Sequence, residues 1–109
     1  MRPMASDGYQ LDDLLELVMA ERADGTRLTL GKPPCVVIGG AAHDMEGPPV
    51  PVAETDHFLR AMASRRQVRE FWQAHLLEFD YVFRRTHPFR VYATDDGESV
   101  MLELQWLES

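Results

Sequence analysis

The sequence predicts an α+β fold in which three helices pack on one face of an antiparallel sheet of about five to six strands. Three observations lead to this prediction. Apolar residues recur with helical spacing near the N-terminus, between Leu11 and Met19. From Glu78 onward, apolar and polar residues alternate with the period of two that is typical of half-buried strands. Asp96 and Gly97 interrupt that alternation as a hairpin turn.

The first helix is predicted because five apolar side chains fall on one helical face: Leu11, Leu14, Leu15, Val18 and Met19. Asp12 and Asp13 lie in its first turn, where the helix dipole favours negative charge. Gly25 is predicted to end it, since glycine readily adopts the left-handed conformation beyond a helix. Residues 1–10 are expected to be a flexible lead-in, and residues 11–109 to form a single domain.

Two strands and a connecting loop are predicted next. Residues 26–30 alternate polar and apolar, with the two leucines directed inward. Residues 31–34 form a turn, because the prolines at 33 and 34 cannot donate hydrogen bonds to a sheet. Residues 35–38 are apolar throughout, which predicts a strand buried on both faces. Residues 41–50 are interpreted as a loop with a short third strand near 42–45.

Two further helices are expected in the middle of the chain. Pro51 suits the first turn of the second helix, whose apolar side consists of Phe58, Leu59 and Met62. Ser64 and Gln67 fit the capping box that begins a third helix. Its apolar face is expected to carry four residues: Val68, Phe71, Trp72 and His75. Trp72 and Trp106 are both predicted to lie in the core, each with an N–H group that needs a partner.

The last third of the chain predicts three strands that form a meander. Phe79, Tyr81 and Phe83 share one face of the first, whereas Asp80 and Arg84 share the other. A turn is predicted at residues 86–88. The two following strands place alternate apolar residues inward: Phe89, Val91 and Ala93, then Val100, Leu102, Leu104 and Trp106. The predicted order of elements is therefore αββ(β)ααβββ.

Composition and charge restrict the classes of partner and compartment. The 109 residues are 45% hydrophobic and 27% charged, as in ordinary globular proteins. The net charge of −7 repels nucleic acid and anionic lipid, so neither is expected as a partner. No stretch approaches the ~20 apolar residues of a membrane span, and no secretory signal is evident. With the single cysteine, these features predict a cytoplasmic protein without membrane insertion.

No catalytic residue, metal site or cofactor is expected. The four histidines have no zinc-like spacing: His43, His57, His75 and His87. Cys35 lies in an apolar run, where burial raises the pKa of a thiol, so it is interpreted as an inert core cysteine. Glu78 and Asp80 fall on one face of a strand, and the simplest interpretation is a pair of exposed charges. The prediction is that the chain is not an enzyme.

Two groups of arginines are candidates for a protein interface. Their residues are Arg65, Arg66 and Arg69 in the first, and Arg84, Arg85 and Arg90 in the second. A solvated surface is the default interpretation of such groups. Use at an interface is the sharper one, because the guanidinium fork binds carboxylates in a bidentate manner.

The order and spacing of five segments resemble a known family. They read Leu-Asp-Asp-Leu-Leu at 11–15, Leu-Thr-Leu-Gly-Lys-Pro-Pro at 28–34, Gly-Pro-Pro at 47–49, Leu-Glu-Phe-Asp-Tyr at 77–81 and Phe-Arg-Val at 89–91. Residues 11–107 resemble the N-terminal, PAS-like domain of PilT-type ATPases. These are cytoplasmic hexameric motors of type IV pilus systems, related to type II secretion ATPases. The resemblance implies a place in pilus retraction and twitching motility or in secretion.

The chain departs from the family pattern at functional positions. Residues 24–28 read Asp-Gly-Thr-Arg-Leu where the family has Ser-Asp-Leu-His-Leu, and Val-Pro-Val at 50–52 replaces Thr-Pro-Glu. Residues 88–92 read Pro-Phe-Arg-Val-Tyr instead of Arg-Phe-Arg-Val-Asn. In the motors, arginines of this strand lie near the neighbouring subunit's nucleotide, so only Arg90 can inherit that role. The phosphate-binding motif Gly-x-x-x-x-Gly-Lys-[Ser/Thr] is missing from the sequence.

The resemblance therefore implies a non-catalytic interaction or regulatory module. Its expected partner is a protein: a pilus or secretion ATPase, a second copy of the chain in a homo-oligomer, or a regulator. Two alternatives stay open. The aromatic stripe at Phe79, Tyr81 and Phe83 could line the pocket of a PAS-like small-molecule sensor, although a core face is favoured. The sequence could also be a fragment of a full-length PilT-like motor ATPase.

Overall fold

The computed structural model describes residues 10–29, 31–45, 49–50, 52–97 and 99–107. Within them the elements follow the predicted order. The helices are α1 (Leu11–Ala20), α2 (Val52–Met62) and α3 (Arg65–Ala74), and the strands are β1 (Gly25–Thr29), β2 (Cys35–Ile38), β3 (Ala41–Asp44), β4 (Leu76–Phe83), β5 (His87–Asp95) and β6 (Val100–Trp106). The short third strand expected near residues 42–45 is present as β3.

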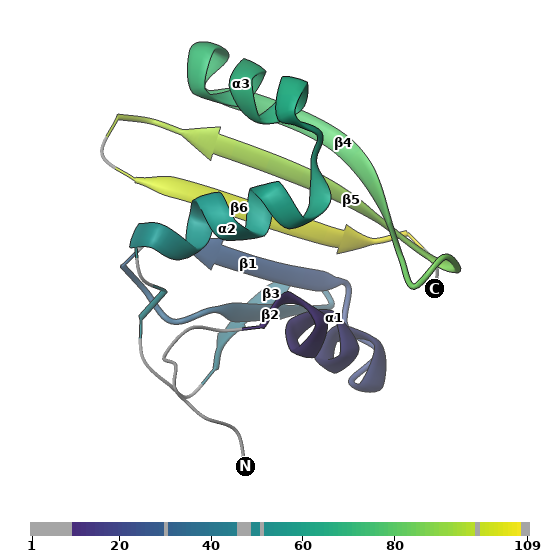
Figure 1. Cartoon of the computed structure of the whole chain (residues 1–109). Helices are drawn as coiled ribbons and strands as arrows, with labels where there is room; N and C mark the ends of the chain where they lie inside the picture. Colours follow the sequence, from purple (N-terminus) through teal and green to yellow (C-terminus); the bar gives the residue numbers. More distant parts are fainter. Residues whose placement is uncertain (1–9, 30, 46–48, 51, 98, 108–109) are drawn as a thin grey trace.

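The described strands form one antiparallel sheet in the order β3-β2-β1-β6-β5-β4. Two consecutive three-stranded units meet where β1 pairs with β6, in a register that sets Leu28 opposite Leu102. The three helices pack on one face of this sheet (Figure 1). The predicted fold class is therefore confirmed.

The core lies between the sheet and the helices. Because side chains alternate across a strand, Phe89 and Val91 of β5 point inward beside Leu104 of β6, and all three are fully buried. The helices contribute fully buried residues to the other side of the core, among them Leu15 of α1 and Phe58 of α2. The inward faces predicted for the last two strands and the first helix are thus confirmed.

The predicted role of Gly25 is wrong. Helix α1 ends at Ala20, and Arg22 rather than a glycine takes the left-handed conformation after it, with φ 54°. Gly25 is instead the first residue of β1. A Cβ atom at this position would collide with the carbonyl oxygen of Leu104 and lie 3.0 Å from the Cα of Gln105. The glycine is required because β1 and β6 approach each other closely there.

The prediction that residues 35–38 are buried on both faces is also wrong. Only Val36 of β2 is buried, and Ile38, on the same face at the end of the strand, is 42% exposed. The helices cover one face of the sheet, so the residues that alternate with these two, Cys35 and Val37, lie on the uncovered face. Cys35 is one of these residues and is half-buried, not part of the core.

The turn between β4 and β5 lies two residues earlier than predicted. Arg84 and Arg85 form it, both with positive φ angles of 53° and 69°, and the Thr86 N–H donates to the Phe83 carbonyl at 3.3 Å. Strand β5 already begins at His87. Arg84 therefore does not share a strand face with Asp80. Left-handed conformations are uncommon for arginine, so neither residue type indicates a turn there.

Helix α3 begins with the predicted capping box of Ser64 and Gln67, but its apolar face is narrower than predicted. Val68 and Phe71 are buried, whereas Trp72 is 41% exposed. His75 is exposed and ends the helix in a left-handed conformation. Trp106 is half-buried at the rim of the core, and its indole Nε1 has no hydrogen-bond partner among the described residues.

Some predictions fall outside the described residues: the lead-in at 1–9, Leu30, Gly47, Pro48 and Pro51. None of the helices in the described part of the chain has the length and apolar character needed to cross a membrane.

Replacing Phe71 and Trp72 separately by alanine should distinguish their environments. Phe71→Ala removes a fully buried ring and should lower the free energy of unfolding by about 3–5 kcal/mol. Trp72→Ala should cost only about 1 kcal/mol, because the exposed ring loses little beyond its edge contact with Phe71 at 4.7 Å between centroids. Urea denaturation of both variants measures the difference, and equal losses would contradict the assignment.

Candidate interaction face

One face of the sheet carries no helix of the described residues and is called here the open face. Side chains that alternate with the core residues point to it from four adjacent strands. They include Arg27 of β1, Glu103 and Gln105 of β6, Arg90 and Tyr92 of β5, and Glu78 and Asp80 of β4. The prediction that Glu78 and Asp80 share an exposed strand face is confirmed. Polar and charged groups dominate this surface.

Arg90 lies between the two carboxylates of the neighbouring strand. It is the cross-strand partner of Asp80, and its Nε donates to Asp80 Oδ1 at 2.9 Å while one Nη donates to Oδ2 at 3.4 Å. The same Nε lies 4.0 Å from Glu78 Oε2. The hydrogen bonds from Arg90 hold the pKa of Asp80 below its ordinary value of 3.8. They raise the pKa of Arg90 in turn.

A second ion pair crosses the open face between β1 and β6. Arg27 and Glu103 are cross-strand partners, with 3.5 Å between a guanidinium nitrogen and Glu103 Oε2. The Nε of Arg27 is buried and has no hydrogen-bond partner among the described residues. An unsatisfied buried donor costs free energy.

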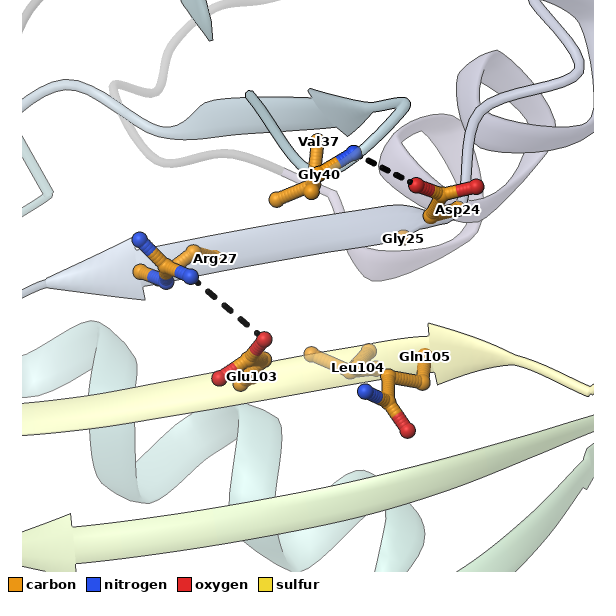
Figure 2. Close-up of a pocket in the computed structure, with 8 residues that line it drawn as sticks. All are labelled: Asp24, Gly25, Arg27, Val37, Gly40, Glu103, Leu104 and Gln105. Carbon is orange, nitrogen blue, oxygen red and sulfur yellow. Dashed lines mark hydrogen bonds and ion pairs between the residues drawn. The ribbon is translucent and has the colours of Figure 1, made fainter. Parts of the chain in front are cut away.

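A hollow of about 230 Å³ lies beside this ion pair. Figure 2 shows its lining, with Gly25 on the floor between Val37 and Gln105, its partners on the two adjacent strands. Immediately before β1, the Asp24 carboxylate accepts a hydrogen bond from the Gly40 N–H at 3.0 Å. The volume is below that of pockets for drug-sized ligands. It suits a single side chain of a docking protein.

Of the two predicted arginine groups, the first lies together on α3, whereas the second is divided between the open face and the β4–β5 turn. Arg90 lies on the open face, but Arg84 lies in the β4–β5 turn, where it forms an ion pair with Glu16 of α1 and stacks 4.7 Å over the Phe83 ring. Arg85 is exposed in the same turn. The remaining three are exposed on α3: Arg65, Arg66 and Arg69.

Cys35 is held near the edge of the open face by Asp44. Its thiol donates to Asp44 Oδ1 at 3.1 Å. Burial, followed by this hydrogen bond and the negative charge of Asp44, raises the pKa of the thiol. The expected direction of the pKa shift is confirmed, whereas the expected location of Cys35 in the core is wrong. In the described part of the chain, no three side chains of the His, Cys, Asp and Glu types lie close enough to hold a metal ion.

The sequence does not predict the hollow or the pair of Arg27 and Glu103. The alternation of β1 and β6 places both residues opposite the core side, which is a signal for exposure. Their contact depends on which strands are neighbours, and the two residues are 76 positions apart. No local pattern in the sequence encodes that pairing.

The fold resembles parts of three solved structures. One is a pilus retraction motor PilT with bound ADP, with a TM-score of 0.78 at 19% identity. The others are the ATPase DotB of Legionella pneumophila, with 0.78 at 16%, and that of Yersinia pseudotuberculosis, with 0.74 at 16%. The chain has the fold of part of PilT and DotB. At this level of identity the likeness concerns the fold alone. It confirms, for the fold, the resemblance to PilT-type proteins inferred from the sequence.

The share of each protein that corresponds is very unequal. The matches cover 89%, 95% and 96% of this chain, but only 29%, 31% and 32% of PilT and the two DotB proteins. The chain therefore spans about a third of their length, as a single N-terminal domain would. No protein-family model matches the sequence, and comparison with curated proteins gives no match.

The ion pair between Arg90 and Asp80 predicts a pH dependence. The folded-state pKa of Asp80 is lowered from 3.8. The ion pair therefore contributes fully to stability above pH 3.8, and this contribution is lost as the pH falls through the lowered pKa. Arg90→Gln should return the pKa of Asp80 toward 3.8 in a carboxyl NMR titration. Arg69→Gln on α3 is the control and should leave the titration unchanged. An equally low Asp80 pKa in the Arg90 variant would contradict this assignment.

Replacement of Asp44 should increase the reactivity of Cys35. In Asp44→Asn the negative charge that raises the thiol pKa is gone. At pH 8 the thiolate fraction, and the rate of reaction with an aromatic disulfide reagent, should rise roughly two- to tenfold. Asp24→Asn makes the same chemical change away from the thiol and should leave the rate as in the parent protein.

Proposed function

We propose that this chain is a non-catalytic interaction domain that docks through its open face on a pilus or secretion ATPase. The observation that carries the proposal is the shared fold. Nearly the whole chain corresponds to about a third of PilT or DotB. A domain with this fold and an open, charged sheet face has a surface for contact with such a motor. The docking would take place in the cytoplasm, which is the location that the sequence resemblance implies for these motors.

The open face supports docking because its charges are arranged on a rigid sheet. Arg90 and Arg27 each have a carboxylate partner on an adjacent strand, so both side chains are positioned before a partner arrives. Preorganised side chains lose less conformational entropy on binding. Beside them, the hollow over Gly25 can accept a protruding side chain.

The proposal leaves ATP hydrolysis to the partner. The sequence has no phosphate-binding loop to supply backbone amides to phosphates. Arg90 is the one residue to which the sequence resemblance assigns a position near a motor's nucleotide, and here it is engaged by Asp80.

Two other functions remain candidates. A PAS-like sensor would need a cavity between sheet and helices, where this chain places fully buried phenylalanines such as Phe58, Phe71 and Phe89. The described hollow opens on the other side of the sheet. A fragment of a longer motor agrees with the coverage, and the open face would then contact other parts of that motor.

The test begins with capture of partners by the tagged chain in its native cells, followed by mass spectrometry and affinity measurement with the purified ATPase. Gln105→Lys projects a charge into the hollow and should weaken binding at least about tenfold, or 1.4 kcal/mol. Gln73→Lys makes the same change on the exposed surface of α3 and should alter affinity less than about twofold.

Two results would overturn this proposal. The first is failure of the purified chain to bind any pilus or secretion ATPase encoded in the same genome. The second is a loss of affinity in Gln73→Lys with normal binding by Gln105→Lys, which would move the interface to α3 and its arginines.

A further inference from the structure

The outer edge of β4 has the properties of a strand-pairing surface. β4 is the last strand in the sheet order, and no strand among the described residues pairs with its outer side. It is eight residues long and pairs with β5 without interruption, from Leu76 opposite Thr94 to Phe83 opposite His87. A long, regular edge strand offers backbone N–H and C=O groups to another strand.

The side chains along this edge follow a symmetric pattern. On the open face, β4 presents Leu76, Glu78, Asp80 and Val82 in turn, which is apolar, acidic, acidic and apolar. Leu76 is 60% exposed and Val82 is 52% exposed. Large apolar side chains are uncommon on unprotected edges because they promote association.

We propose that β4 pairs in antiparallel fashion with β4 of a second copy of this chain, about a twofold axis at Phe79. In this register Leu76 of each copy lies opposite Val82 of the other. The twofold axis repeats this contact, so the two copies form two Leu76–Val82 pairs on the open face. On the other face Leu77 lies opposite Tyr81, and Phe79 opposite its own copy.

The acidic centre of the strand is compatible with this pairing because of Arg90. The register sets Glu78 opposite Asp80 of the other copy, which would be unfavourable for unscreened like charges. Each copy brings one Arg90, which donates to Asp80 at 2.9 Å and lies 4.0 Å from Glu78. Two guanidinium groups therefore flank the four carboxylates.

The opposite edge of the sheet lacks these features. β3 has only four residues, all exposed, and they are Ala41, Ala42, His43 and Asp44. It has no large apolar side chain and no symmetric pattern. The order of side chains along β4 is self-complementary. It therefore favours β4 as the pairing edge and a second copy of the chain as its partner.

This inference specifies the self-association that was one of the expected partnerships and does not depend on docking to an ATPase. The edge of β4 and the hollow over Gly25 are distinct surfaces, since β5 lies between β4 and β6, whose Gln105 lines the hollow. Gln105→Lys should therefore leave dimer formation unchanged, so failure of one proposal is distinguishable from failure of the other.

Cysteine cross-linking tests the register. In a Cys35→Ser background, Leu76→Cys and Val82→Cys chains are prepared separately, mixed and oxidised mildly. The mixture should form a disulfide-linked dimer, because these positions face each other across the strands. Each variant alone should not, since equivalent residues would lie about 20 Å apart along the strand. Cross-linking of the single variants equal to that of the mixture, or none in the mixture, overturns the proposed register.

Sedimentation velocity tests the interface without cross-links. At protein concentrations up to about 100 µM, the unmodified chain should form a dimer whose fraction rises with concentration. Affinities in this range are typical of modest interfaces. Val82→Lys should abolish the dimer, whereas Ile38→Lys, at an exposed apolar residue on β2, should retain it. Circular dichroism and thermal melts check that both variants fold. A monomeric parent chain at all concentrations, or equal loss in both variants, would overturn the proposal.

Discussion

The pairing of β1 with β6 is the interaction on which the rest of the structure depends. It joins residues near the start of the chain to residues near its end, in five consecutive cross-strand pairs from Gly25–Gln105 to Thr29–Met101. Closing a loop of this length costs conformational entropy that only later contacts offset. Gly25 permits the close approach to Leu104, and buried Thr26 donates to the Cys35 carbonyl at 2.7 Å, which fixes β2 on the other side. Without this junction, two three-stranded units would expose their apolar faces.

One-sided coverage of that sheet explains the distribution of candidate functional residues. The helices bury one set of alternating side chains, so the other set remains available for contacts. On this open face, charge pairs between adjacent strands hold Arg27 and Arg90 in place. The hollow lies at the same junction, because Gly25 of β1 and Leu104 and Gln105 of β6 line it. The β1–β6 contact and the proposed docking surface thus involve the same residues.

Local patterns predicted some elements well and others poorly, for identifiable reasons. The capping box at Ser64 and the hairpin at Gly97 depend on short-range hydrogen bonds, and both are present in the structure. The turn at Arg84 and Arg85 gave no such signal, since neither residue favours positive φ. Phe71 and Trp72 are neighbours with similar apolar character, yet one is buried and the other exposed. Their difference depends on where α3 meets β4, which helical spacing alone does not specify.

The sequence by itself determined the α+β class, the order of elements and the inward face of most strands, because hydrophobic periodicity acts over a few residues. It also carried the resemblance to the PilT family through the order of short segments. Only the tertiary structure decided that β6 lies between β1 and β5, that Arg90 is separated from Arg84 and Arg85, and that β4 forms an edge. These features follow from the relative placement of distant segments. That placement is set by how the whole core packs, and no single segment contains it.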